Sequence, residues 1–394
     1  MTILKVDTVS GIGTEGTVLD GDTTFDSLNY MTLPKGTTTQ SGQSSSGISS
    51  VTGAIRYNTD SNKMECFTGT DWWEIAVSPT INTSQRGLSA GGHIPGATPA
   101  SPSPVTVKRI EYINMTNEGT GVYFGDLTAT RYCRNGAGGS ITRGIFFGGY
   151  SSTPSAAYLN TIDYVTIATT GDAIDFGDTT TTTQHGTALS NNTRGLYAGG
   201  HLTSSPYPTS NHIGYVTIAS TGNTTDFGDM YAARFSVASA ASQTRGLYAG
   251  GSAQYFPNQA DDNVIQYLTI ASTGNTVDFG DLNTKMHWCQ GASSNTRAVW
   301  VGGYVAPGTS DYMQMTIIAT LGNANDFGDL WTGAHNGGVM SNQINGFLMG
   351  GEPVRQTRIQ KFALNGSTAT AVPFGDLSTG IAYNACTSNT HGGL

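Results

Sequence analysis

Side chains suited to metal or ligand chemistry recur at one place in this sequence, six or seven residues after each Phe-Gly-Asp triplet. They are aromatic or histidine in every copy: Tyr132, His185, Phe235, His287, His335 and Tyr383. Three histidines held together could bind a metal ion, because imidazole nitrogen is a common metal ligand. The alternative is packing between neighbouring repeats. We favour packing, and we expect no metal and no cofactor.

Charged side chains recur with the same period. Each triplet ends in an aspartate: Asp126, Asp178, Asp229, Asp281, Asp329 and Asp376. Six carboxylates could suggest calcium, but a turn aspartate that caps backbone N–H groups explains them without a metal. Arginines recur as well: Arg86, Arg143, Arg194, Arg245 and Arg297. We expect them to pair with backbone carbonyls or a neighbouring acid where repeats meet, with ligand recognition as the alternative.

Composition excludes several classes of partner. A net charge of -9 opposes binding to phosphate groups, so we expect no nucleic-acid partner. No apolar stretch is long enough to span a bilayer, and the start, MTILKVDTVSG, lacks the features of a secretion signal. We therefore expect a soluble protein without membrane insertion. The four cysteines have no CxxC or zinc-type spacing and are expected to be free thiols: Cys66, Cys133, Cys289 and Cys386.

The elements that position these residues are repeats of about 50 residues. Besides its Phe-Gly-Asp triplet, each of six copies contains a Gly-Gly pair, at Gly91-Gly92, Gly148-Gly149, Gly199-Gly200, Gly250-Gly251, Gly302-Gly303 and Gly350-Gly351. A period of this length is typical of β-propeller blades. Apolar alternation and turn residues indicate four short strands per copy, the second ending at Gly-Gly and the fourth containing the triplet. The sequence predicts an all-β fold, a six-bladed β-propeller with four-stranded blades.

The segment after each triplet is rich in Ala, Ser and Gly, as expected for the innermost strand of the next blade, where converging strands leave little room. The first copy begins at its second strand, near Arg86, whereas the last copy is followed by one more first strand, within residues 378–388. We predict that this C-terminal strand completes the first blade and closes the ring, which removes open sheet edges. The six aromatic or histidine residues would then ring one mouth of the central channel.

The repeats resemble the kelch family over about residues 85–394. The resemblance lies in the Gly-Gly pair, an aromatic in the third strand (Tyr164, Tyr215, Tyr267), and a Phe-Gly-Asp-Leu-like turn that leads to arginine at residues 229–234. The fourth strand has Phe where kelch repeats have tryptophan. Asn-Asp-Phe-Gly-Asp repeats of this type look more like those in structural proteins of marine bacteriophages. The resemblance implies a kelch-like propeller in a virion structural protein.

The N-terminal part of the chain differs from the repeats. We divide the chain into a β-rich attachment segment at 1–40, a Gly/Ser linker at 41–50, a β-hairpin module at 51–80 and the propeller at 81–394. Residues 30–78 resemble a module common in phage tail-fibre and appendage proteins, where an intertwined trimer mounts the fibre on the virion. The resemblance implies a homotrimer that attaches to other virion proteins. The alternative is a monomeric hairpin packed beside the propeller.

Candidate binding residues lie in the connections between second and third strands, which share one face of a propeller with the fourth-to-first connections. The second-to-third connections vary here, at residues 93–109, 150–160, 201–211, 252–263, 304–310 and 352–357, while the turns of the opposite face repeat closely. Variable loops on a rigid scaffold commonly build a binding surface. Aromatic side chains among Pro, Ser and Asn suit sugar stacking or protein contact, and we predict receptor binding by Tyr150, Tyr207, Tyr255, Phe256 and Tyr304.

Three functions compete. The first is a tail-fibre or similar appendage protein of the virion, whose propeller binds a host-surface glycan or protein during adsorption. The second is a capsid or neck decoration whose propeller only packs against other virion proteins. The third is an enzyme of the galactose-oxidase or sialidase kind. Because the copper pattern, the Asp boxes and the HExxH, P-loop and GxSxG motifs are all missing, we expect a binding protein with no catalytic residues, assembled into virions in the host cytoplasm.

Overall fold

The computed structural model describes residues 35–36, 55–60, 63–68, 70–74, 85–95, 105–134, 136–152, 155–203, 207–254 and 260–394. Every regular element in these ranges is a β-strand. The chain divides into two compact units, Met1–Asn82 and Thr83–Leu394. The segments predicted at 1–40 and 41–50 lie almost entirely outside the described residues.

The described part of the first unit is a sheet in the order β1-β2-β3-β4. Its strands are β1 Lys35–Gly36, β2 Ile55–Asn58, β3 Lys63–Phe67 and β4 Trp72–Glu74. β2 and β3 pair antiparallel, and Arg56 forms an ion pair with Glu65 at 2.7 Å across them. The same guanidinium lies over the ring of Trp72. Both members of the ion pair are more than nine-tenths buried, so this small sheet is organised around a polar pair.

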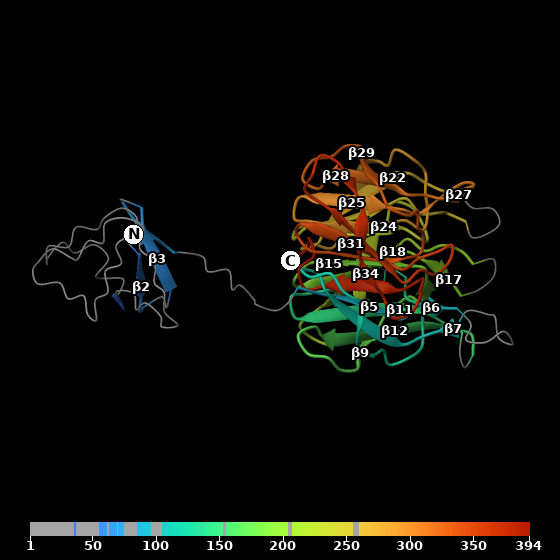
Figure 1. The fold of residues 1–394 in the computed structure, drawn as a ribbon, viewed down its shortest axis with the longest axis horizontal. Helices are drawn as coiled ribbons and strands as arrows, with labels where there is room; N and C mark the ends of the chain where they lie inside the picture. Colours follow the sequence, from blue (N-terminus) through green and yellow to red (C-terminus); the bar gives the residue numbers. More distant parts are fainter. Residues whose placement is uncertain are drawn as a thin grey trace, which may run out of the picture. The chain divides into compact units, whose positions relative to one another are not determined.

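The second unit is a six-bladed β-propeller, which confirms the predicted fold (Figure 1). Blade 1 consists of β35 Ala385–Ser388, β5 Arg86–Ala90, β8 Arg109–Asn114 and β9 Val122–Asp126. Blade 2 consists of β10 Ala137–Gly139, β11 Arg143–Ser151, β12 Ala157–Thr166 and β13 Ile174–Asp178. Blades 3 and 4 consist of β15 Thr187–Ser190, β16 Arg194–Ala198, β18 His212–Thr217 and β19 Thr225–Asp229, and of β20 Ala238–Ala241, β21 Arg245–Ala249, β22 Val264–Thr269 and β23 Val277–Asp281.

Blades 5 and 6 consist of β24 Gln290–Ser293, β25 Arg297–Val301, β28 Tyr312–Ile317 and β29 Asn325–Asp329, and of β30 Gly338–Ser341, β31 Asn345–Met349, β32 Arg358–Ala363 and β34 Val372–Asp376. In blade 5 the outer strand β29 also pairs in parallel with β33 Ala369–Thr370. Short strands in the connections are β6 His93–Ile94, β7 Val105–Thr106, β14 Thr183–Gln184, β17 His201–Leu202, β26 Tyr304–Val305 and β27 Gly308–Thr309.

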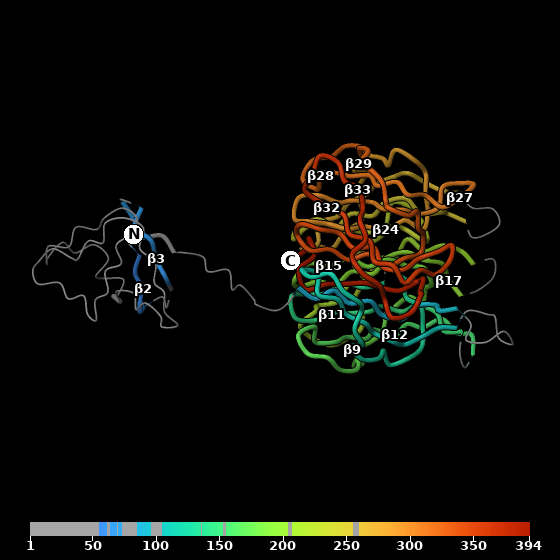
Figure 2. Tube along the Cα trace, in the orientation of Figure 1, coloured from blue at the N-terminus to red at the C-terminus, as the bar shows by residue number. Residues whose placement is uncertain are grey.

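The ring closes through the C-terminal strand, as predicted. β35 pairs antiparallel with β5, with Ala385 opposite Ala90 and Ser388 opposite Gly87. In Figure 2 the red C-terminal segment returns to the blue-green strands of blade 1. The first and last strands of the propeller therefore belong to one sheet, and blade 1 has no open inner edge.

The innermost strands β35, β10, β15, β20, β24 and β30 contact one another in that order around the axis. Serine hydroxyls link several of them to the blade before or after. Ser239 Oγ donates to the carbonyl of Ala188 at 2.7 Å, and Ser388 Oγ donates to the carbonyl of Ser341 at 2.6 Å. Small side chains let these strands approach closely enough for such bonds.

Apolar side chains fill the junctions between blades. The described residues form six core clusters, and each cluster joins two adjacent blades. In β22, for example, Ile265 packs toward blade 5 with Trp300, whereas Leu268 packs toward blade 3 with Leu196. The third strands are apolar on both faces because every blade is covered on both sides.

The Phe-Gly-Asp triplet fastens the outer strand of one blade to the next blade. In blade 3, the main-chain N–H of Asp229 donates to Asn275 Oδ1 at 3.0 Å, and the N–H of Gly274 donates to the carbonyl of Phe227 at 2.8 Å. Gly228 has a φ of 144°, and a Cβ there would lie 2.6 Å from the backbone of Gly274. The aspartate thus donates its backbone N–H, and the acceptor is the asparagine side chain in the Thr-Gly-Asn turn of the neighbouring blade.

The repeated arginines cross the same junctions. Arg194 Nη1 donates to the carbonyl of Ile270 in the next blade at 2.9 Å, and its guanidinium lies over Tyr215 of its own blade. The other four make equivalent bonds to main-chain carbonyls: Arg86, Arg143, Arg245 and Arg297. Of the two partners expected from the sequence, a backbone carbonyl or an acid, the structure has the carbonyl.

A polar side chain in the third strand ties most blades to the connection before them. Gln266, Gln314 and Gln360 accept hydrogen bonds from the main-chain N–H groups of Tyr231, Asn283 and Thr332. In blade 2 the residue is Asp163, which accepts from the N–H of Thr128 and pairs with Arg131 at 2.9 Å. Both charged side chains have no exposed surface. These third-strand contacts were not predicted from the sequence, because the residue type differs between blades.

Candidate functional site

Two tiers of residues surround the mouth of the channel on the loop face, which we define as the face built by the second-to-third and fourth-to-first connections. In the outer tier, the residue after each Gly-Gly pair bridges to a residue ahead of the inner strand. The pairs are His93 with Ala382, Tyr150 with Tyr132, His201 with Gln184, Ser252 with Phe235, Tyr304 with His287, and Glu352 with His335.

Gly-Gly makes this arrangement possible by turning the chain against the next blade. Gly250 has a φ of 65°, and a Cβ there would lie 2.6 Å from the carbonyl oxygen of Met286. The N–H of Gly251 donates to the same carbonyl at 2.9 Å. A side chain at the first glycine would therefore separate two blades at the rim of the mouth.

The inner tier consists of residues with positive φ, namely His185, Ser236, Trp288, Asn336 and Tyr383. Their main chains are hydrogen-bonded in series, with the N–H of each residue from Ser236 onward donating to the carbonyl of the one before it. The series spans blades 3, 4, 5, 6 and 1, and blade 2 contributes no member to it.

The six residues predicted at the mouth are divided between the tiers. Tyr132, Phe235, His287 and His335 lie in the outer tier, whereas His185 and Tyr383 lie in the inner one. The structurally equivalent position is six residues after the triplet's aspartate in every blade, which would have selected Gln184 and Ala382 in blades 3 and 1. Because the prediction required an aromatic or histidine side chain, it selected His185 and Tyr383, which lie one residue after the equivalent outer-tier positions.

Aromatic contacts join three of these six residues directly. The ring centroids of Tyr132 and Tyr383 lie 5.3 Å apart, those of Tyr132 and His185 5.7 Å, and those of His185 and Tyr383 5.9 Å. Phe235 touches this group through His185 at 6.2 Å. His93 packs on Tyr132 at 4.5 Å. Side chains from blades 1 to 4 thus meet over the axis.

His287 and His335 belong to a second aromatic cluster, around Trp288. His335 stacks on Trp288 at 5.3 Å, and His287 contacts it at 4.4 Å. Both histidines also face carboxylates: His287 Nδ1 lies 2.8 Å from Asp261, and His335 Nε2 lies 3.5 Å from Glu352. The six predicted residues therefore form two groups on the two sides of the mouth.

The histidines of the first cluster are neutral at pH 7. Burial, together with the charge of Arg355, lowers the pKa of His93 to about 4. Burial likewise lowers the pKa of His185 well below its usual range. Within the part of the chain that the structure describes, no group of three or more His, Cys, Asp or Glu side chains is arranged to hold a metal ion.

Two of the predicted receptor-binding residues are half-buried in these clusters. Tyr150, near the end of β11, packs on Tyr132 at 5.4 Å, and Tyr304, in β26, packs on His287 at 5.3 Å. Each ring is therefore held in place by a mouth residue and shows part of its surface to the loop face.

Tyr207 is the exposed member of the predicted set. It is 39% exposed, has a φ of 57°, and lies edge-on to His201 at 5.9 Å. Tyr255 and Phe256 lie outside the described residues.

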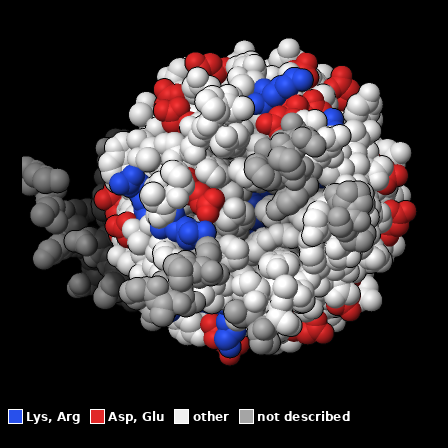
Figure 3. Space-filling view, turned by 90° about the vertical axis from the view of Figure 1, so that its right-hand side faces the viewer, with Lys and Arg blue, Asp and Glu red and all other residues white. Residues whose placement is uncertain are grey.

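Two exposed aromatics of the loop face were missed from the sequence. Tyr231 is 73% exposed and Trp331 is 49% exposed, and both lie in fourth-to-first connections, two residues after a triplet's aspartate. Arg358 lies over the Trp331 ring at 4.0 Å. The signal was present in the repeats, because the other four copies have Thr, Thr, Asn or Ser at this position. Figure 3 shows this face as mostly uncharged, with small scattered groups of either sign.

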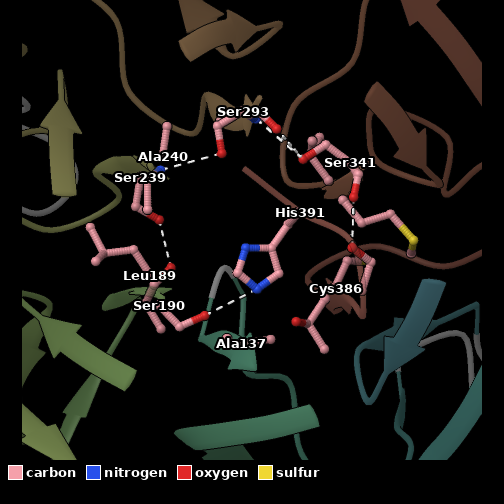
Figure 4. Close-up of a pocket in the computed structure, with 17 residues that line it drawn as sticks. Ala137, Leu189, Ser190, Ser239, Ala240, Ser293, Ser341, Cys386 and His391 are labelled. Carbon is pink, nitrogen blue, oxygen red and sulfur yellow. Dashed lines mark hydrogen bonds between the residues drawn. The ribbon is translucent and has the colours of Figure 1, made fainter. Parts of the chain in front are cut away.

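The opposite end of the channel is lined by inner strands of all six blades, around a cavity of about 70 Å³. His391 projects into it, with Nε2 lying 3.1 Å from the carbonyl of Gly139 and 3.3 Å from Ser190 Oγ (Figure 4). Burial lowers the pKa of His391 to about 4. A neutral imidazole therefore occupies this end.

No protein-family model matches the sequence, and no curated protein matches it. The described residues contain no helix with the length and apolar character needed to cross a bilayer.

Proposed function

We propose that this protein is a structural protein of a bacteriophage virion, a tail fibre or similar appendage, whose loop face binds a glycan or protein on the host surface. The observation that carries the proposal is the set of exposed aromatic side chains on that face, Tyr207, Tyr231 and Trp331. The phage assignment rests on the resemblance of the repeats and of the N-terminal segment. The proposed role is binding and not catalysis.

The surroundings of these aromatics suit a carbohydrate or a polar protein surface. An aromatic ring gives a large apolar contact at a small cost in conformational entropy, and its face stacks on the C–H groups of a sugar. The surrounding surface is mostly uncharged (Figure 3), so a neutral ligand meets no field that opposes it. The blades below are closed into a ring and keep the loops in fixed positions.

Replacement of Tyr207, Tyr231 and Trp331 by Ala is expected to weaken adsorption of virions to host cells tenfold or more. Each stacked aromatic contributes about 0.5–1.5 kcal/mol beyond its buried area, and the three contributions add. The fold should be kept, because all three side chains are exposed. Adsorption rate and the melting temperature of the purified chain are the two measurements.

Leu321 and Ile344 provide the matched control. They are 58% and 55% exposed and lie in the turns of the opposite face. Their replacement by Ala removes exposed apolar surface of similar kind and should leave adsorption unchanged. Equal loss from both sets of variants, or unchanged adsorption by the loop-face variant in assembled particles, would favour a capsid or neck decoration that only packs against virion proteins.

We also propose that the first unit joins three chains and attaches them to other virion proteins. A small sheet with a polar pair at its centre buries little apolar surface by itself, and association supplies the missing core. Light scattering is expected to give the mass of a trimer for the full chain and of a monomer for a chain that starts at Ser84. A monomer in both samples would contradict the attachment role.

A further inference from the structure

Arg134, which precedes the inner strand of blade 2, is buried without a counter-charge. It is 2% exposed, and none of its three guanidinium nitrogens has a hydrogen-bond partner among the described residues. Arg131, which is buried to the same degree, pairs with Asp163. An ionised group in the protein interior is strongly unfavourable unless it is paired and hydrogen-bonded. The contrast between these two arginines needs an explanation.

Arg134 interacts electrostatically with groups from three other blades, none of which is a carboxylate. Its pKa is affected by Cys289 ahead of blade 5 and by Tyr383 ahead of blade 1, and the guanidinium in turn acts on His185 ahead of blade 3. Arg134 also lies shortly before β10, an innermost strand that contacts β35 and β15 around the axis, so the residue lies at the axial edge of blade 2. Burial raises the pKa of Cys289 to about 11, so the thiol is neutral. Burial lowers the pKa of Arg134 to about 10, which still leaves it charged at pH 7.

The inner tier adds further buried donors. The amide nitrogen of Gln184 lies 2.9 Å from His185 Nε2 and can only donate, so the proton of this neutral imidazole resides on Nδ1. That Nδ1 atom, Ser236 Oγ and Trp288 Nε1 are buried and have no partner among the described residues. Unpaired buried acceptors are present in the same region, at Asn336 Oδ1 and Asp261 Oδ1, and the other oxygen of Asp261 faces His287. Arg134 differs from these groups in being a charged donor with all three nitrogens unpaired, and such a donor favours an anion.

The sequence places Arg134 there by a local insertion. From the outer-tier residue to the inner-strand residue that lies opposite the one before Gly-Gly, blade 2 has four steps, from Tyr132 to Gly136, whereas blade 4 has three, from Phe235 to Ala238. The one additional residue occurs in the blade that has no member in the inner tier. Arg134 thus enters the ring where the series of main-chain hydrogen bonds is interrupted.

We propose that Arg134 is the principal ligand of an axial anion site that binds a small oxyanion, with the neutral donors of the inner tier around it. The planar guanidinium matches the paired oxygens of carboxylate, phosphate and sulfate. The site is independent of the exposed aromatics of the loop face, and its test does not depend on the receptor.

Thermal unfolding of the full chain in zwitterionic buffer tests the proposal, with sodium sulfate, phosphate or acetate added at an ionic strength held constant with sodium chloride. At a hundredfold excess over its dissociation constant, a bound oxyanion is expected to raise the melting temperature by about 5 °C. Arg134→Met should remove this response. A response to sodium chloride alone that depends on Arg134 would assign a halide and overturn the oxyanion site.

Arg245→Met is the matched control, because Arg245 already donates to the carbonyls of Ile318 and Ala319 and should not contribute to anion binding. This variant should keep the full response. If Arg134→Met does not fold, anomalous diffraction from crystals of the unaltered chain soaked in selenate decides the matter. A selenium peak beside Arg134 supports the site. No peak there, or equal responses of the unaltered chain and Arg134→Met, would refute it.

Discussion

A chain that lacks residues 377–394 is expected to lose the cooperative thermal unfolding of the propeller. The deletion removes β35, the inner strand of blade 1, and leaves the edge of β5 from Gly87 to Ala90 without its partner. It also removes buried side chains from the junction of blades 6 and 1, among them Leu377 and Cys386. Without them the two blades lose both their shared core and their hydrogen-bonded closure.

Calorimetry and near-ultraviolet circular dichroism during heating measure this loss. Removal of residues 1–82 is the control, because these residues form a separate compact unit and the remaining propeller should unfold in one sharp transition. Addition of a peptide spanning residues 377–394 should restore a transition to the truncated chain. If the truncated chain melts as sharply and at the same temperature as the full chain, closure by β35 does not hold the ring together.

Asp163→Gln is expected to lower the free energy of unfolding by about 3–5 kcal/mol, because it leaves the buried guanidinium of Arg131 without its partner. In a domain of this size the melting temperature should fall by roughly 6–12 °C. Glutamine still offers a carbonyl oxygen to the main-chain N–H of Thr128, as Gln314 does for Asn283 in blade 5. The loss therefore reports the unpaired charge and not a missing hydrogen bond.

Blade 5 supplies the matched rescue. At the two equivalent positions it has Met286 and Gln314, a neutral pair in which the amide lies 3.9 Å from the thioether sulfur. The double variant Arg131→Met with Asp163→Gln copies this pair into blade 2 and should recover most of the lost stability. A double variant no more stable than Asp163→Gln alone, or a single variant that melts like the unaltered chain, would show that the ion pair does not act in this way.

The repeat made the propeller predictable. Gly-Gly and Phe-Gly-Asp mark positions where the backbone contacts a neighbouring blade. At Gly228 and Gly250, for example, a Cβ would lie only 2.6 Å from backbone atoms of that blade. Glycines with this steric requirement therefore occur in every blade, at the same places in each repeat. Counting them gave the number of blades, and their phase at the two ends gave the closure by β35. The hydrogen bonds from the third strand could not be found in this way, because Asp163 and Gln266 occupy equivalent positions but differ in residue type.

The candidate site was less accessible to sequence reasoning. The sequence located the connections that form the loop face and several of the side chains at the mouth, but not which of them are exposed: Tyr150 and Tyr304 are half-buried, whereas Tyr231 and Trp331 stand out. Exposure depends on which neighbours the chain brings together.

The sequence by itself determined the architecture of this protein, because the turn and junction chemistry of a blade is local and is repeated along the chain. Only the tertiary structure decided what lies at the axis. In the sequence, nothing distinguishes Arg134 from other arginines in loops. Its burial follows from the convergence of six blades on one channel. The burial of a charge depends on the neighbouring blades, and its pairing depends on contacts between separate elements of the chain, as the pairing of Arg131 with Asp163 also shows. The residues in such contacts do not recur with the same types in the other repeats, so the sequence gives no pattern by which to find them.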